Sequence, residues 1–135
     1  MNQKIGNPKE APRLKRTILA VDDDPDILNL EKKILEKEGF EVVTTTQGAQ
    51  AVSLMQQGDF ALVLLDIMMP GMDGFEVSRT IRREQKGKQL PVIFLTARDD
   101  AASMREGFRS GGSVFLSKPF TANQLVRLVY SIIGK

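Results

Sequence analysis

The feature of this sequence that most restricts its fold is a regular alternation between short apolar runs and longer amphipathic stretches. Several of the runs are continuous and rich in β-branched residues, which is typical of strands that are covered on both faces. The five runs are Thr17–Val21, Glu41–Thr45, Ala61–Leu65, Pro91–Leu95 and Ser113–Leu116. They indicate five strands, each followed by a stretch that can form a helix.

The stretches between and after the runs carry apolar residues at helical spacing. The clearest stripe consists of Leu125, Leu128, Val129, Ile132 and Ile133. A second stripe consists of Ile27, Leu30, Ile34 and Leu35, and weaker helical patterns cover residues 48–57, 73–85 and 99–110. The order βαβαβαβαβα predicts a doubly wound (βα)5 fold of the α/β class, in which helices cover both faces of a five-stranded parallel sheet.

Polar residues follow four of the five runs. In a parallel sheet the carboxyl ends of the strands lie at one edge, and the crevice at that edge is where such folds carry their functional sites. We therefore expect these residues to converge from separate parts of the chain. They are Asp22, Asp23 and Asp24 after the first run, Asp66 after the third, Thr96 after the fourth and Lys118 after the fifth.

Each of these residues also has a purely structural interpretation. Asp24 precedes Pro25, a pairing typical of a helix N-cap and the first helical residue, so we place Asp24 outside the site. Asp66 alone could belong to a turn, Thr96 alone could cap the next helix, and Lys118 alone could be a surface lysine. Their coincidence at equivalent strand ends favours a shared site.

The composition restricts the chemistry of that site to carboxylates, lysine, hydroxyls and backbone groups. The chain contains no histidine and no cysteine, which excludes thiolate metal sites and Ser-His-Asp triads. The adjacent acids Asp22 and Asp23 would repel each other unless a cation offsets their charge. Hard oxygen ligands of this kind suit Mg²⁺, and a carboxylate such as Asp66 can accept a phosphoryl group. The charges of these three acids are balanced by Mg²⁺ together with Lys118.

Four segments of the sequence, taken together, resemble the receiver domain of response regulators, the phospho-acceptor domain of two-component signalling that also forms the chemotaxis response regulators. The segments are ILAVDDDPDI, LVLLDIMMPGMDG, VIFLTAR and FLSKPF, and the resemblance runs from about Thr17 to Ile133. It implies a flavodoxin-like receiver fold. It also implies that Asp66 accepts a phosphoryl group from the phosphohistidine of a histidine kinase or phosphotransfer protein, as one step of a phosphorelay.

The resemblance assigns metal-binding roles at the ends of the first and third runs. Asp23 and Asp66 would bind Mg²⁺ directly, and Asp22 would bind it through water. The main-chain carbonyl of Met68 would be a further ligand, and water would fill the remaining positions.

The resemblance also assigns roles on the other side of the site. Lys118 would pair with a phosphoryl oxygen, and its bond to Pro119 would be cis. Thr96 would donate its hydroxyl to another phosphoryl oxygen. Phe115 stands where the family carries the aromatic residue that changes orientation on phosphorylation, although an ordinary core position is the alternative. The face formed by residues 99–133 would then change its affinity for a partner.

One segment departs from the family's pattern. Gly111 is followed by Gly112, Ser113 and Val114, where the family often has a small alanine and then an acid. An additional glycine costs conformational order on folding. We therefore expect residues 107–114 to be less stiff than is usual.

Three other functions are compatible with parts of this pattern. A Mg²⁺-dependent aspartyl-phosphate phosphatase usually needs a second acid two residues beyond its nucleophile, and here that position is Met68. A flavodoxin-like cofactor binder needs a loop that offers N–H groups to phosphate after the first strand, and VDDDPD would repel phosphate. The third is a phosphorylation-independent interaction module. We predict a receiver that is not an enzyme for external substrates and catalyses only its own phosphorylation and dephosphorylation.

The amino-terminal segment differs from the rest of the chain in charge. Residues 1–16 carry five basic side chains against Glu10, a net charge of +4, so the rest of the chain carries −2 of the total +2. A basic, proline-containing and weakly apolar segment is typical of a disordered leader, so we place the receiver domain at residues 17–135. A nucleic-acid-binding arm is the less favoured interpretation.

The sequence also carries expectations about location and output. No apolar run approaches the ~20 residues of a membrane span, and the leader has no signal-peptide core, which favours a cytoplasmic protein without a membrane partner. The downstream partner would be a separate protein, or an output domain if the chain is part of a longer regulator or hybrid kinase.

Overall fold

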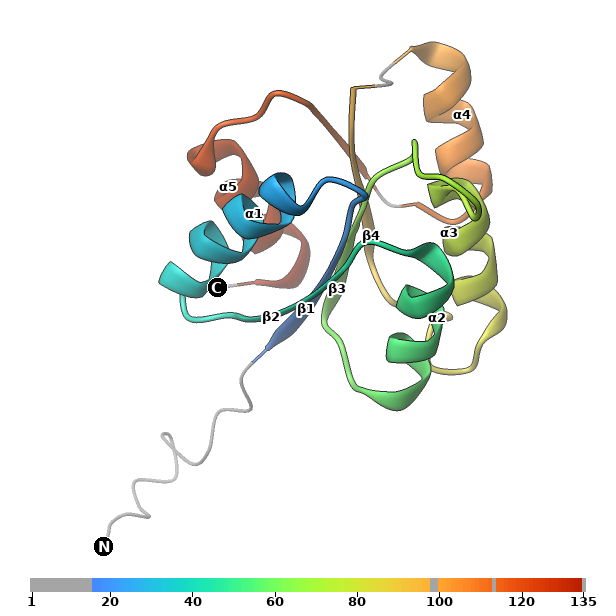
Figure 1. Ribbon diagram of the computed structural model, residues 1–135, viewed down its shortest axis with the longest axis horizontal. Coiled ribbons are helices and arrows are strands. Elements are labelled where there is room, and N and C mark those ends of the chain that lie inside the picture. The colour runs from blue at the N-terminus through green and yellow to red at the C-terminus, as the bar shows by residue number, and fades with distance from the viewer. Residues whose placement is uncertain (1–15, 98–99, 113, 135) are drawn as a thin grey trace, which may run out of the picture.

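The computed structural model describes residues 16–97, 100–112 and 114–134, and Figure 1 shows their arrangement. The strands are β1 (Thr17–Val21), β2 (Glu41–Thr45), β3 (Leu62–Leu65), β4 (Val92–Thr96) and β5 (Val114–Ser117). The helices are α1 (Pro25–Lys37), α2 (Gly48–Gln57), α3 (Gly74–Arg83), α4 (Ala101–Arg109) and α5 (Ala122–Ile133). The predicted α/β class and the alternation of strands and helices are confirmed.

The strands form one parallel sheet in the order β2-β1-β3-β4-β5. Every neighbouring pair runs in the same direction, with Val21 opposite Thr45 on one side and opposite Leu65 on the other. The order reverses beside β1, because β2 lies on one side of it and β3 on the other. This reversal opens the crevice in which doubly wound sheets hold their functional residues, and β1 and β3 both end there.

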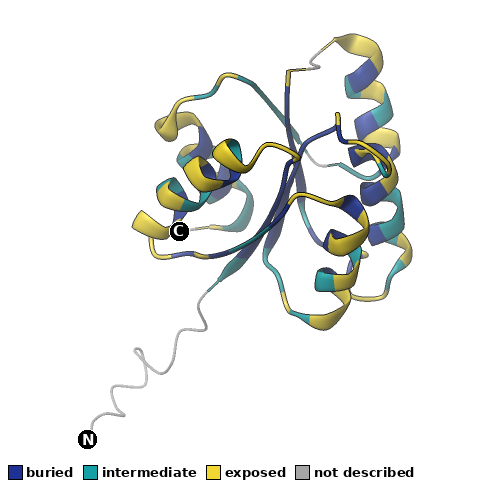
Figure 2. Ribbon diagram, viewed as in Figure 1, coloured by how far each residue is buried: buried dark blue, intermediate teal, exposed yellow. Residues whose placement is uncertain are grey.

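Helices cover both faces of the sheet, as Figure 1 shows. On one face α1 and α5 pack over a cluster that includes Leu35, Leu64 and Val129. On the other face α2, α3 and α4 lie over a cluster that includes Val63 and Phe94. Figure 2 shows the buried residues concentrated in the strands and on the inward sides of the helices. The two clusters fix the strands from both sides, so the strand ends are held in place. No helix in the described ranges has both the length and the apolar character that a bilayer span requires.

Short polar side chains begin four of the helices, as their N-cap preferences predict. The Asp24 carboxylate accepts a hydrogen bond from the Asp26 N–H at 2.9 Å, which confirms Asp24 as the cap of α1. Asp100 caps α4 by accepting from the Ser103 N–H at 3.0 Å. Thr96 is therefore not needed as the α4 cap. Asp73 and Thr121 cap α3 and α5.

The inward face of α1 differs from the predicted stripe. Leu30, a member of the predicted stripe, is 45% exposed. The residues that α1 buries are Leu28, Glu31 and Leu35. The spacing of these three residues is also helical, but one of them is an acid. A search for apolar residues alone therefore selects the neighbouring face of the helix, which carries Leu30.

The segment between α4 and β5 is tied to α3. The Ser78 hydroxyl donates to the Ser110 carbonyl at 2.8 Å. The Arg82 guanidinium donates to the Gly111 carbonyl at 3.0 and 2.5 Å. It also donates to the carbonyls of Gly87 and Leu90 in the loop before β4. The additional glycine therefore does not leave this backbone loose over the described residues up to 112, while Ser113 lies outside them.

The leader predicted at residues 1–16 falls almost entirely outside the described residues, which begin at Arg16. The Arg16 guanidinium donates to the carbonyls of Ile133 at 3.0 Å and Gly134 at 2.5 Å. It also lies 5.2 Å from the centre of the Phe40 ring. Arg16 therefore belongs with the folded domain and links the start of β1 to the end of α5.

Candidate functional site

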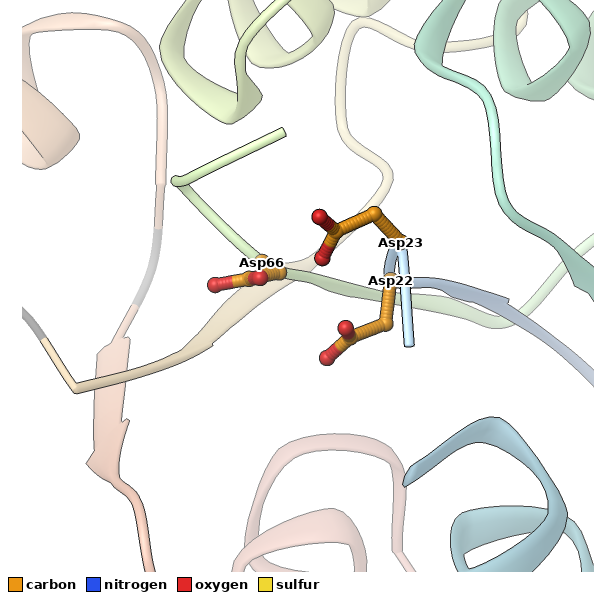
Figure 3. A group of neighbouring side chains, drawn as sticks. All are labelled: Asp22, Asp23 and Asp66. Atoms are coloured by element: carbon orange, nitrogen blue, oxygen red, sulfur yellow. The ribbon is translucent and has the colours of Figure 1, made fainter. Parts of the chain in front are cut away.

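Three carboxylates meet at the ends of β1 and β3. Each of Asp22, Asp23 and Asp66 has a carboxylate oxygen within 4.8 Å of one from each of the others. Figure 3 shows these side chains gathered where the two strands end. The strand register causes the meeting, because the Asp66 N–H donates to the Val21 carbonyl at 3.0 Å and so places Asp66 beside Asp22. Asp22 and Asp66 are buried, at 1% and 6% exposure, whereas Asp23 is exposed.

Lys118 joins this group from the end of β5. Its ammonium donates to Asp22 Oδ2 at 2.5 Å and lies 3.5 Å from Asp66 Oδ2. Burial lowers the pKa of Lys118, but the hydrogen bond to Asp22 and the nearby carboxylates outweigh it and raise the pKa overall. Lys118 is therefore a fixed positive charge at neutral pH. Its peptide bond to Pro119 is cis, as the resemblance implied.

The surroundings of Asp66 disfavour the ionised form of its carboxyl group. Burial, followed by the charge of Asp22, raises the pKa of the Asp66 carboxyl above its ordinary value, against the lowering effects of Lys118 and of the Met68 and Ile67 N–H groups. The Met68 N–H lies 3.4 Å from Asp66 Oδ1. A bound cation would favour the ionised form of this carboxyl group.

Glu31 is a fourth acid near the site, and it was absent from the sequence predictions. It projects from α1, is 1% exposed, and its Oε1 atom has no hydrogen-bond partner within the described part of the chain. Burial, then the charge of Asp22, raises the pKa of Glu31 to about 8, although Lys118 acts in the opposite direction. Its position three residues after Leu28 and four before Leu35 was the available sequence signal.

The remaining predicted residues surround the cluster. Thr96 is fully buried at the end of β4, and its carbonyl accepts from the Lys118 N–H at 2.9 Å. Phe115 lies on β5, opposite Phe94 of β4, and its side chain is partly buried. Met68 is 57% exposed at the outer edge of the site. The structure therefore brings all of the predicted strand-end residues to one edge of the sheet.

The site is open to solvent on the side of Asp23. A hollow of about 560 Å³ beside Asp23 is lined by residues 46–49 and 70–72. The side of Asp22 is closed, since Asp22 is buried and its Oδ1 accepts from the Asp24 N–H at 3.0 Å. A small ion would therefore reach the carboxylates from the Asp23 side.

The donor set fits a hard divalent cation. It offers carboxylate oxygens from three residues, one exposed and two buried, and an imidazole or thiolate ligand is excluded because histidine and cysteine are absent. Mg²⁺ prefers one or two carboxylates and keeps several waters, which the open side of the site allows. Lys118 pairs with two of the three acids, Asp22 and Asp66, so the described residues favour an additional positive charge at the site.

The chain is similar to known proteins in sequence and in fold. Transcriptional regulatory protein SrrA of Staphylococcus aureus is 37% identical over 118 residues, which cover 87% of this chain and 48% of SrrA. The chain thus spans about half the length of the curated relatives it matches. The chemotaxis protein CheY4 of Vibrio cholerae superposes with a TM-score of 0.86 at 29% identity, covering 88% of this chain and 99% of CheY4.

A second solved structure concerns the metal. The receiver domain of the sensor histidine kinase PA1611 from Pseudomonas aeruginosa, described with a magnesium ion coordinated in its active-site cleft, has a TM-score of 0.84 and 29% identity. The match covers 90% of this chain and all of that one, at 100%. Residues 18–130 match the family described as the response regulator receiver domain. Because this match covers most of the sequence, the chain belongs to the response regulator receiver domain family of two-component systems.

Proposed function

We propose that Asp66 is the phospho-acceptor of this receiver and that Mg²⁺ binds at Asp22, Asp23 and Asp66. The observation that carries the proposal is the meeting of three carboxylates and one ammonium at 2.5 to 4.8 Å, from segments far apart in the sequence. The ligand set would be Asp23 and Asp66 directly, Asp22 through water, and the Met68 carbonyl. Phosphoryl transfer needs positioning and charge neutralisation more than covalent help from the protein, and this site offers both.

The transfer would proceed from a phosphohistidine of the upstream partner. A carboxylate oxygen of Asp66 attacks the phosphorus, a P–O bond forms, the P–N bond breaks, and the departing imidazole takes up a proton. Lys118, already 3.5 Å from Asp66 Oδ2, would shift its hydrogen bond from Asp22 to a phosphoryl oxygen. Thr96 would donate its hydroxyl to another. When bound, Mg²⁺ would neutralise charge on the phosphoryl oxygens.

The same contacts would drive a conformational switch. Phosphorylation replaces the single charge of the Asp66 carboxylate by a phosphoryl group that carries roughly −1.5 to −2 charges and three acceptor oxygens. Moving a population from 1:99 to 99:1 requires about 5.5 kcal/mol of differential interaction. Charge-assisted hydrogen bonds contribute about 1.5–3 kcal/mol each, so bonds from Lys118 and Thr96 are of the required size. Phe115 would change orientation as Thr96 moves, and the face formed by residues 99–133 would change its affinity for a partner.

The experiment is labelling with radioactive acetyl phosphate in the presence of Mg²⁺. The wild-type protein should incorporate phosphate, and Asp66→Asn should abolish incorporation because the nucleophilic oxygen is lost. Asp59→Asn is the matched control, since Asp59 is almost fully exposed, pairs with Lys86 at 3.6 Å and is not among the acids of the site. Normal labelling of Asp66→Asn would place the acceptor elsewhere, and an unlabelled wild-type protein would favour a phosphorylation-independent interaction module.

The partners follow from the same proposal. Upstream we propose a histidine kinase or a phosphotransfer protein, and downstream a separate protein or an output domain. The chain would catalyse only its own phosphorylation and dephosphorylation, because Met68 occupies the position where an aspartyl-phosphate phosphatase carries its second acid. A cytoplasmic location belongs to this proposal, since the domain must meet its kinase partner there.

A further inference from the structure

Four phenylalanine rings form a row from α3 to the outer surface of α4. The ring centres of Phe75 and Phe94 lie 5.6 Å apart, and those of Phe94 and Phe115 lie 5.1 Å apart. The Phe108 ring meets Phe115 edge-on at 5.7 Å and is half exposed. Such spacings are typical of attractive aromatic pairs. The Phe115 ring is therefore held between a buried ring of β4 and a surface ring of α4.

Two glycines provide the space for this row. A Cβ atom at Gly107 would lie 2.4 Å from Phe115 Cζ and 2.6 Å from its Cε1. A Cβ atom at Gly112 would lie 2.3 Å from Phe94 Cε2. Carbon atoms in contact lie about 3.5–4.0 Å apart, so even the smallest side chain cannot occupy either position beside the present rings. The Phe115 ring lies where a residue-107 side chain would otherwise be.

The backbone around Gly107 has little freedom to move aside. Ser110 and Gly111 are bound to α3 through Ser78 and Arg82, as described above. The Gly112 N–H donates to the Gly107 carbonyl at 2.9 Å. A methyl group at residue 107 would therefore displace the Phe115 ring rather than the helix.

The position of this ring is linked to the site through β5. Phe115 is paired with Phe94 in the sheet, and two residues further along Thr96 is paired with Ser117, next to Lys118. Thr96 and Lys118 are the two groups that the proposed switch moves. A reorientation of the Phe115 ring and a movement of Thr96 or Lys118 therefore both involve β4 and β5 or the residue that directly follows β5.

We propose that Gly107 is a positioning residue of the switch. Because Gly107 lacks a side chain, it keeps the Phe115 ring against Phe94. An alanine at this position moves the ring, without phosphorylation, to the orientation that phosphorylation would otherwise give it. The inference rests on the proposed function of Asp66. Replacing a glycine inside a helix by alanine ordinarily stabilises the helix, so a loss of stability would report the contact with the ring, and the response of the ring to phosphorylation would report its role in the switch.

The first test is a double-mutant cycle measured by urea unfolding of the full chain without Mg²⁺. Gly107→Ala should lower the urea midpoint of the wild-type protein. In a Phe115→Leu background the same change should lower the midpoint clearly less or raise it, since leucine lacks the Cε and Cζ atoms nearest to the added Cβ, and only Phe94 Cε2, at 3.1 Å, remains close. Phe115→Leu is thus the matched control. An increase of the midpoint in both backgrounds would show that the ring does not depend on Gly107 and would overturn the inference.

The second test observes the ring itself by NMR of ¹³C-phenylalanine protein. Unphosphorylated Gly107→Ala should lose the nuclear Overhauser contact between the Phe115 and Phe94 rings, and acetyl phosphate with Mg²⁺ should then shift the Phe115 signals less than in the wild type. Persistence of that contact in Gly107→Ala would contradict the inference. Final phosphate incorporation, measured on the same samples, should equal that of the wild type. Absence of wild-type labelling would refute the acceptor role of Asp66. The unfolding cycle does not depend on phosphorylation, so it would still test whether Gly107 determines the position of the Phe115 ring.

Discussion

Replacing Glu31 with glutamine should remove most of the dependence of this domain's stability on pH between about pH 5.5 and 7.5. The folded chain holds the Glu31 proton up to about pH 8, whereas the unfolded chain loses it near the ordinary value of 4.5. Between these values the folded state binds more protons, so the free energy of unfolding falls as the pH rises. Glu31 therefore contributes its stabilising effect fully below the unfolded pKa and loses it as the pH passes the folded pKa.

The magnitude follows from the shift. One pKa unit corresponds to about 1.4 kcal/mol, so the full window amounts to about 5 kcal/mol, and two pH units within it to about 3 kcal/mol. Glu31 is almost completely buried, so solvent screening reduces this little. With a urea m-value of about 1–3 kcal/mol/M, the midpoint of the wild-type protein should fall by roughly 1 M or more between about pH 5.5 and 7.5.

The assay is urea unfolding at several pH values in the presence of EDTA, so that no divalent cation alters the charge of the site. The chain has no histidine, so no other side chain ordinarily titrates in this range. Asp66 acts in the same direction because its pKa is also raised, and Asp66→Asn measures its share. Glu36→Gln, on the exposed side of the same helix, controls for the loss of a glutamate charge. If Glu31→Gln and the wild type have the same pH dependence, the reasoning about Glu31 is wrong.

Two further substitutions test other contacts. Lys118→Ala should lower the free energy of unfolding in EDTA by about 3 kcal/mol, because it leaves the buried Asp22 without its partner at 2.5 Å, and Mg²⁺ should restore part of this loss. The control Lys86→Ala breaks an exposed ion pair with Asp59 and an exposed hydrogen bond to the Gly58 carbonyl, and it should cost less than about 1 kcal/mol by the same measurement. Arg82→Lys should cost about 2 kcal/mol or more in chemical unfolding, since one ammonium cannot reproduce the bonds of the guanidinium to three carbonyls. Arg83→Lys on the exposed side of α3 should leave stability nearly unchanged, and equal losses in both arginine variants would contradict this account.

The sequence by itself determined the order of the elements and the edge at which the functional residues meet. Both follow from local patterns, because apolar periodicity identifies strands and helices, and the residue that follows a strand lies at that strand's end in any parallel sheet. This is why Asp22, Asp66 and Lys118 could be predicted to converge although up to 96 residues separate them. The cap of α1 at Asp24 was predictable for the same reason, since its hydrogen bond reaches only two residues along the chain.

The tertiary structure alone decided how the helices are rotated against the sheet and which side chains fill the remaining space. The face of α1 that turns inward carries Glu31 and leaves Leu30 exposed, because packing against β2, β1 and α5 fixes the rotation of the helix. The contact between Gly107 and the Phe115 ring is likewise a contact between two elements. Such contacts depend on the relative placement of distant segments, and the periodicity of a single segment contains no information about its partner.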